Sequence, residues 1–115
     1  MTRFAGYAAV FDHADRGGDV IRAGAFASAA GGVPLLWEHG GRVGSVERIA
    51  EDGRGLRVIG AAEKAVAPGM GLSIGYRVRA ARDLARGREL LDLELIEVSL
   101  VRLPMQPLAR VIAVE

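Results

Sequence analysis

One serine of the chain has neighbours that could make it a nucleophile. Residues 71–75 read Gly-Leu-Ser-Ile-Gly, and the two glycines remove side chains that would keep a substrate carbonyl away from the Ser73 hydroxyl. A serine hydroxyl is protonated at neutral pH, so it needs a base, and imidazole is the side chain best suited to accept its proton. The pattern indicates acyl transfer by a serine and a histidine.

Two histidines could supply that base. His39 ends the apolar run 33–39 and is followed by two glycines that leave room for a substrate, whereas His13 lies in an aspartate-rich turn that we expect to face solvent. We therefore predict that His39 is the base. Both histidines precede Ser73, whereas in α/β-hydrolases the histidine follows the serine, so the chain order excludes that fold.

A catalytic imidazole also needs an acceptor for its second nitrogen, which fixes the tautomer and stabilises the imidazolium. Glu97 is a charged residue in the otherwise apolar segment 95–101, an arrangement that is costly unless the charge is paired. Asp92 and Glu94 have less apolar neighbours and rank below it. The prediction is a catalytic set of Ser73, His39 and Glu97, and a structural ion pair between Glu97 and an arginine is the alternative.

Two further groups of polar residues could suggest other chemistry. Asp12, His13, Asp15 and Asp19 match neither a calcium loop nor a zinc motif, so we predict a solvated turn, with no metal and no organic cofactor. Arginines also cluster in a second segment, where Asp83 and Glu89 dilute them and no aromatic residue beyond Tyr76 could stack on bases. A solvated hairpin is predicted there, and nucleic-acid binding is disfavoured; the arginines are at positions 77, 79, 82, 86 and 88.

Most of the elements that must position these residues are predicted to be β-strands. Apolar runs and period-two alternation predict six or so strands, within 4–11, 33–39, 43–49, 55–59, 72–79, 91–101 and 111–114, and the apolar pattern also restarts at 20–21. The apolar phase slips at Ile96, as it would at a β-bulge. One or two short helices are predicted, over the alanine-rich segment 23–30 and over 61–67. We expect a mainly β fold with short helices (α+β), arranged as a small closed or nearly closed β-barrel.

Length and composition indicate one soluble domain. The 115 residues suffice for a single core, so we expect one domain over 1–115. The chain has no cysteine, which excludes disulfides and thiolate metal sites, and the net charge of +1 gives no strong field toward nucleic acid. We find no signal peptide and no apolar segment long enough to span a membrane, so we expect a cytoplasmic protein.

Several segments together resemble the prohead maturation proteases of tailed phages, in order and over nearly the whole chain. They are residues 6–11, 18–20, 24–26, 35–39, 72–76 and 97–101. The resemblance implies the fold of the herpesvirus assemblins, a β-barrel ringed by helices, and serine endopeptidase activity on the scaffolding part of the major capsid protein. It places the family's catalytic residues on His39 and Ser73. Assemblins use a second histidine as the third member, and Glu97 in the matching strand takes that place here.

The segment between Gly60 and Gly71 is shorter than in relatives, which leaves alternatives open. The main alternative is a catalytically silent capsid-assembly or scaffolding protein that retains the fold. A third alternative, based on the arginine hairpin, is a small nucleic-acid-binding β-barrel. Relatives also occur in gene transfer agents. The resemblance implies the capsid protein and its scaffolding segment as partners, with homodimerisation or self-processing, inside assembling proheads in the cytoplasm.

Overall fold

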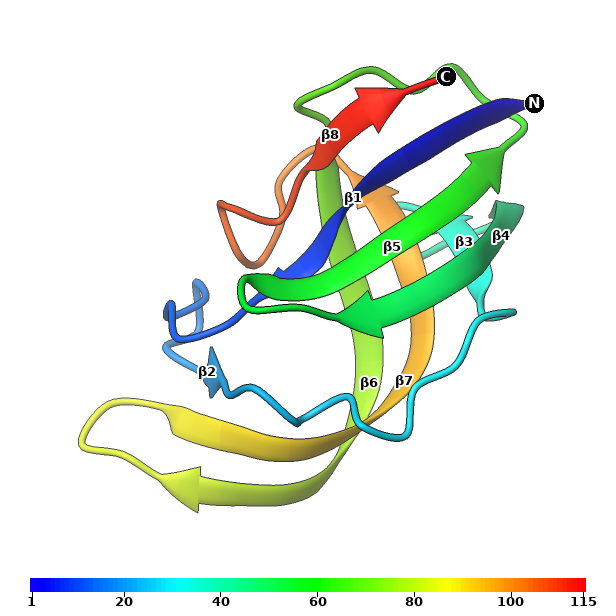
Figure 1. Ribbon diagram of the computed structural model, residues 1–115. Coiled ribbons are helices and arrows are strands. Elements are labelled where there is room, and N and C mark those ends of the chain that lie inside the picture. The colour runs from blue at the N-terminus through cyan, green and yellow to red at the C-terminus, as the bar shows by residue number, and fades with distance from the viewer.

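The chain folds into eight β-strands and no helix (Figure 1). The computed structural model describes all residues, 1–115. The strands are β1 (Thr2–Val10), β2 (Val20–Ile21), β3 (Pro34–Trp37), β4 (Arg42–Glu51), β5 (Gly55–Ala62), β6 (Gly71–Asp83), β7 (Arg88–Val101) and β8 (Val111–Val114). The predicted strands are thus confirmed with small changes at their ends, and β2 is a strand that the sequence analysis does not predict. The predicted helices at 23–30 and 61–67 are wrong. No segment forms a helix that could cross a bilayer.

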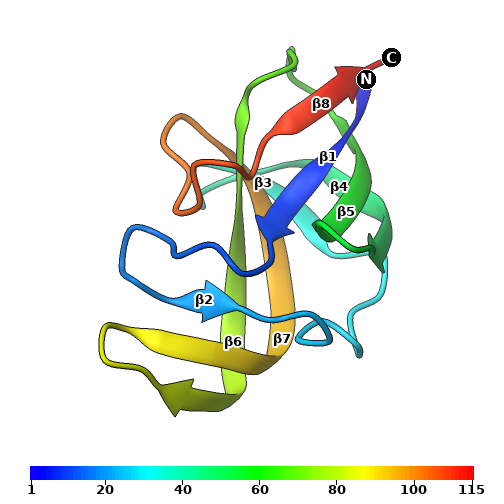
Figure 2. The ribbon, with the colours of Figure 1, turned by 60° about the vertical axis from the view of Figure 1, so that its left-hand side comes forward.

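A single mixed sheet contains all eight strands, in the order β2-β7-β3-β4-β5-β1-β8, and β6 pairs with β7 outside this order. The strands β2 and β3 pair with the start and the end of β7, and β6 pairs along its length. β2 and β3 run parallel to β7, and all other pairs are antiparallel. The long β6–β7 hairpin extends from the rest of the sheet, and β2 lies beside its far part (Figure 2). The strand β7 is therefore the central element, with contacts to β2, β3 and β6.

The sheet curls around the core without closing into a barrel, which corrects the expected closed or nearly closed arrangement. The segment that ends in β8 meets the start of β6 through an isolated bridge between Gly71 and Arg110 and through three backbone hydrogen bonds. These bonds run from Leu72 N to Ala109 O, at 2.9 Å, and from Val111 N to Met70 O and Gly69 N to Val111 O, at 2.8 Å each. β8 has four residues whereas β6 has 13, so β8 is too short to pair along β6.

The segment 23–30 forms turns because its backbone has partners that a helix would not use. Its N–H groups bond three residues back, from Ala27 to Gly24 and from Ala29 to Phe26, and Gly24 has φ +93°. The carboxylate of Glu51 in β4 accepts the N–H groups of Gly24 and Phe26, at 2.7 Å each. In the segment 61–67, the first two residues complete β5 by pairing with β1. Tertiary contacts therefore override the helix propensity of alanine in both segments.

A β-bulge in β7 decides which side chains face the core. Gly75 of β6 pairs with Glu97, whereas the next residue of β6 pairs with Leu95, so Ile96 has no partner and is 45% exposed. The predicted bulge at Ile96 is therefore confirmed. Leu93 lies in the core before the bulge and Val98 lies in it afterwards. Because side chains alternate with period two, the bulge turns Glu97 away from the core.

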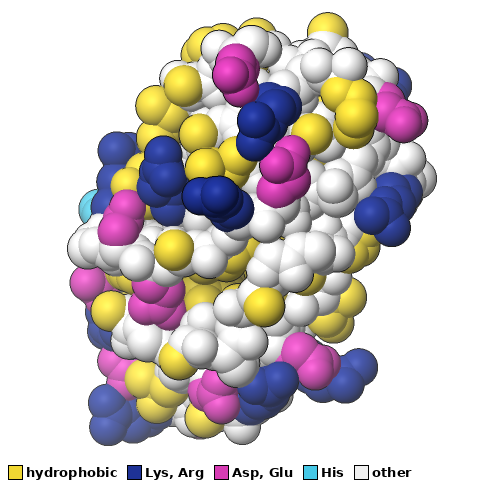
Figure 3. Space-filling view, turned by 45° about the vertical axis from the view of Figure 1, so that its right-hand side comes forward, with side chains coloured by type: hydrophobic (Ala, Val, Ile, Leu, Met, Phe, Trp, Pro, Cys, Tyr) yellow, Lys and Arg dark blue, Asp and Glu magenta, His cyan; other side chains and the backbone are white.

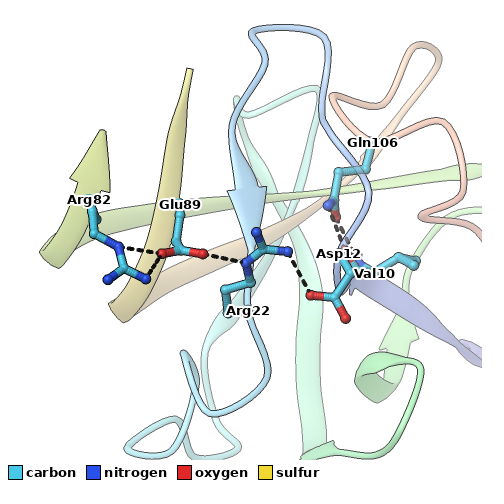
Figure 4. Close-up of polar contacts among 6 residues, drawn as sticks. All are labelled: Val10, Asp12, Arg22, Arg82, Glu89 and Gln106. Carbon is cyan, nitrogen blue, oxygen red and sulfur yellow. Dashed lines mark hydrogen bonds and ion pairs between the residues drawn. The ribbon is translucent and has the colours of Figure 1, made fainter. Parts of the chain in front are cut away.

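Two polar networks connect segments that are distant in sequence (Figure 4). The buried Glu89 of β7 accepts hydrogen bonds from Arg22, at 2.8 Å, and from Arg82, and Arg22 also pairs with Asp12. These contacts hold β2 and the β6–β7 hairpin together. Separately, the buried side chain of Gln106 bonds to both the N–H and the carbonyl of the last residue of β1, at 2.8 Å each.

Candidate active site

An imidazole and a carboxylate meet where β3 ends beside β7. The Nδ1 atom of His39 lies 2.6 Å from Oε1 of Glu97, whose residue is 8% exposed. A carboxylate only accepts hydrogen bonds, so Nδ1 carries the proton and Nε2 is left as the acceptor. Asp92 and Glu94 instead lie near arginines of the hairpin, so Glu97 is the one of the three candidate carboxylates that contacts His39.

The backbone holds His39 in an unusual conformation. Parallel pairing of Trp37 with Leu100 brings the end of β3 beside β7, and the next two residues, Glu38 and His39, have φ +49° and +58°. Positive φ is uncommon outside glycine, and such residues persist where the surrounding structure fixes them, often at functional sites. Glu38 N donates to Leu100 O, at 2.9 Å, and its carboxylate accepts the N–H of Arg102, at 3.1 Å. These contacts fix the turn that presents the imidazole.

Ser73 lies on the same outer face of the sheet. It pairs with Ser99, and Gly75 pairs with Glu97, so the four residues share one face of the β6–β7 pair. Ser73 is 6% exposed, and no hydrogen bond joins its hydroxyl to His39. No fully buried side-chain polar atom lacks a partner, so the unpaired Ser73 hydroxyl retains contact with solvent. The structure thus joins His39 to Glu97 and places Ser73 nearby without a bond to either.

The two glycines around Ser73 make room for the chain itself. A Cβ on Gly75 would lie 2.5 Å from Oε1 of Glu97, and one on Gly71 would lie 2.6 Å from the carbonyl oxygen of Val101. The expectation that both glycines mainly give access to a substrate is therefore incomplete. Gly75 allows the carboxylate of Glu97 to lie over β6 and reach His39.

Ser99 is a site residue that the sequence analysis does not identify. It is completely buried, donates a hydrogen bond of 2.8 Å to Oε2 of Glu97 and accepts one of 3.1 Å from His39 N. A signal was present, because Ser99 is polar, lies in an apolar strand and is two residues from Glu97, hence on the same face. Serine is common enough in strands that this spacing alone does not indicate a role.

The side chains of the aspartate-rich turn bond to other groups of the same chain. One oxygen of Asp15 accepts the N–H groups of Gly17 and Asp19, and Asp19 pairs with Arg88 across the hairpin. This confirms a polar turn over residues 12–19. No group of three or more His, Cys, Asp or Glu side chains is placed to hold a metal ion.

The arginines of the hairpin are largely neutralised. Arg77 and Arg79 lie beside Glu94, Arg82 beside Glu89 and Arg88 beside Asp19; Arg86 has no carboxylate partner. Basic and acidic side chains also alternate over the face shown in Figure 3. A nucleic acid would have to compete with these carboxylates, which supports the interpretation of a solvated hairpin.

One comparison with known proteins is informative. The family model described as the caudovirus prohead serine protease matches residues 1–115. No curated protein matches the chain.

Proposed function

The chain belongs to the caudovirus prohead serine protease family, and on that premise we propose that it is a serine endopeptidase that cleaves the scaffolding part of the major capsid protein during prohead maturation. The observation that carries the proposal is the 2.6 Å contact between His39 and Glu97 on the face that also bears Ser73. The capsid protein and its scaffolding segment are the proposed partners, and the assembling prohead in the host cytoplasm is the proposed place of action.

Each residue has one role in the proposed reaction. Ser73 Oγ attacks the carbonyl carbon of the scissile peptide, and its proton passes to Nε2 of His39. Glu97 accepts the Nδ1–H of His39 and so stabilises the imidazolium. His39 then gives the proton to the leaving amine nitrogen as the C–N bond breaks, which leaves an acyl ester on Ser73. A water molecule, deprotonated by His39, hydrolyses that ester and restores the serine.

The near-complete burial of Glu97 suits its role. A carboxylate in a weakly screened environment interacts strongly with an adjacent imidazolium, and hydrogen bonds to both of its oxygens keep it in place. A separation between nucleophile and base in the free enzyme is compatible with catalysis, because such contacts tighten when substrate binds.

A catalytically silent assembly protein is the second candidate function. The observation that favours it is the state of Ser73, which is 6% exposed and forms no hydrogen bond to His39. In that case the pair of His39 and Glu97 would stabilise the fold alone.

Co-expression with the major capsid protein encoded nearest to this chain tests the proposal. We compare the wild type, Ser73→Ala and the control Ser45→Ala, whose serine lies in β4. The length of the capsid protein is measured by intact mass, and a fluorophosphonate probe reports whether Ser73 is reactive. Shortening and labelling with the wild type and the control, both lost in Ser73→Ala, would support the protease. Assembled particles with full-length capsid protein and no labelling would support the silent assembly protein.

A further inference from the structure

We propose that Ser99 is a positioning residue that locks the carboxylate of Glu97 and the backbone of His39 into one arrangement. The inference rests on the proposed function, since it concerns the same base and carboxylate. It assigns Ser99 no contact with substrate, because its side chain is completely buried.

The hydroxyl of Ser99 has both of its partners fixed by chemistry. A carboxylate oxygen can only accept, so the hydroxyl proton points to Oε2 of Glu97, at 2.8 Å. A backbone N–H can only donate, so a lone pair of the same oxygen receives the N–H of His39, at 3.1 Å. One atom therefore bonds to both members of the pair.

The first bond restrains the carboxylate. The terminal torsion of a glutamate is broad, so a carboxylate bonded at one oxygen could rotate away from its partner. Here Oε1 contacts His39 and Oε2 contacts Ser99, so both oxygens are held. The carboxylate plane is thereby fixed relative to the imidazole.

The second bond restrains the base. His39 follows Glu38 in a turn where both residues have positive φ, a conformation of higher energy for side chains with a Cβ. The acceptor supplied by Ser99 satisfies the N–H of His39 in that conformation. The same hydroxyl thus holds the backbone of His39 and the carboxylate of Glu97.

Ser99 is also placed so that it does not compete with the nucleophile. It pairs with Ser73 across β6 and β7, but its proton is donated to Glu97 and its oxygen is inaccessible to substrate. Two serines on neighbouring strands therefore have separate tasks, since the hydroxyl of Ser73 has no partner and that of Ser99 is bonded to both members of the pair.

The test compares Ser99→Ala, which removes the hydroxyl, with Ser99→Thr, which keeps it. Ser45→Ala is the control for a serine removed elsewhere in the sheet, and thermal unfolding verifies that each variant folds. We measure the maximal rate and the half-saturating concentration of fluorophosphonate labelling. We expect Ser99→Ala to lower the maximal rate about 10- to 100-fold with little change in the half-saturating concentration, because a hydrogen bond to a charged group is lost. Ser99→Thr should retain most of the rate.

A second measurement does not depend on activity. The Nδ1 proton of an imidazole bonded to a carboxylate gives a far-downfield proton resonance, which His39→Gln would assign. We expect this resonance in the wild type and in Ser99→Thr, and its loss or upfield movement in Ser99→Ala. If the wild type is not labelled at all, the proposed function fails, and the resonance still decides whether Ser99 positions the pair.

An unchanged resonance together with an unchanged labelling rate in Ser99→Ala would overturn the inference. Loss of the resonance and of the labelling rate in the control Ser45→Ala would also overturn it, because the effect of removing a serine would then not be specific to position 99. If the methyl group of threonine prevents folding at this buried position, Ser99→Cys takes its place, since it keeps the size of the side chain with a weaker donor.

Discussion

A single added methyl group at Gly75 should disable the proposed site although Ser73, His39 and Glu97 are all retained. In Gly75→Ala the new Cβ would lie 2.5 Å from Oε1 of Glu97, whereas ordinary contact begins at 3.4 Å, so the oxygen must move by at least 0.9 Å (3.4 minus 2.5). A movement of 0.9 Å lengthens the 2.6 Å contact with His39 by at most that amount, to about 3.5 Å, which is beyond a normal hydrogen bond. A displacement of this size in a catalytic group lowers the rate about 100-fold.

The fold should survive this change. The nearest atoms all belong to the flexible side chain of Glu97, which can rotate away while the backbone stays in place. Alanine is favoured over glycine within a strand by about 0.5–1 kcal/mol, and the crowding opposes this by about 1–3 kcal/mol. We therefore expect the free energy of unfolding to fall by at most about 2.5 kcal/mol, less than a loss of folding would require.

Fluorophosphonate labelling at matched concentrations, with urea unfolding of the same samples, measures both quantities. Gly53→Ala is the control, because a Cβ at Gly53 would meet no atom within 4 Å and its φ is not positive. The control should label at the rate of the wild type. Labelling of Gly75→Ala within about threefold of the wild type would refute the reasoning, since the contact between Glu97 and His39 would then be dispensable.

Two further predictions concern the polar networks of Gln106 and Glu89. Gln106→Ala should lower the free energy of unfolding by about 2–4 kcal/mol, measured in urea, because it removes two buried hydrogen bonds to the backbone of Val10; a loss below about 0.5 kcal/mol would contradict this. Hydrogen bonds from Arg22, and then from Arg82, lower the pKa of Glu89 in the folded chain. The ionised carboxylate therefore stabilises the fold fully at a pH above the usual glutamate pKa, and this stabilisation is lost as the pH falls through the lowered pKa. The melting temperature of the wild type should therefore fall more steeply below about pH 4 than that of Glu89→Gln, and parallel curves would contradict the assignment.

The sequence allows the strands to be predicted because their signals are local. Alternation and turn residues indicate where each strand lies, and the phase slip at Ile96 reports the bulge directly. No local signal in the sequence shows that the two segments predicted as helices are not helical. Segment 23–30 has the composition of a helix, and the groups that cap its turns come from Glu51, which is distant in sequence. The open sheet also depends on how far β8 can pair, which composition does not report.

The residues of the candidate site also differ in how far the sequence alone predicts them. Ser73 and His39 are predicted from residue type, spacing and family resemblance, and their catalytic roles remain predictions. Glu97 is preferred over Asp92 and Glu94 from the sequence, because it is a charge among apolar residues. Its contact with His39 depends on tertiary structure, because parallel pairing of β3 with β7 brings the two residues together across 58 positions. Ser99 was missed because its role depends on two hydrogen bonds rather than on its type.

The bulge at Ile96 means that the location of the chemistry depends on a count of residues. If all residues were kept and the strand paired regularly, without a bulge, the alternation beyond Leu95 would reverse, and Glu97 and Ser99 would face the core while Val98 faced solvent. Loss of residue 96 itself would instead leave Leu95 and Glu97 adjacent and opposite the adjacent residues Tyr76 and Gly75, so Glu97 would keep its face. A deletion of one codon at position 96 should therefore preserve both the core and the proposed catalytic face, whereas a deletion within the segment 97–100 would reverse the residues that follow it.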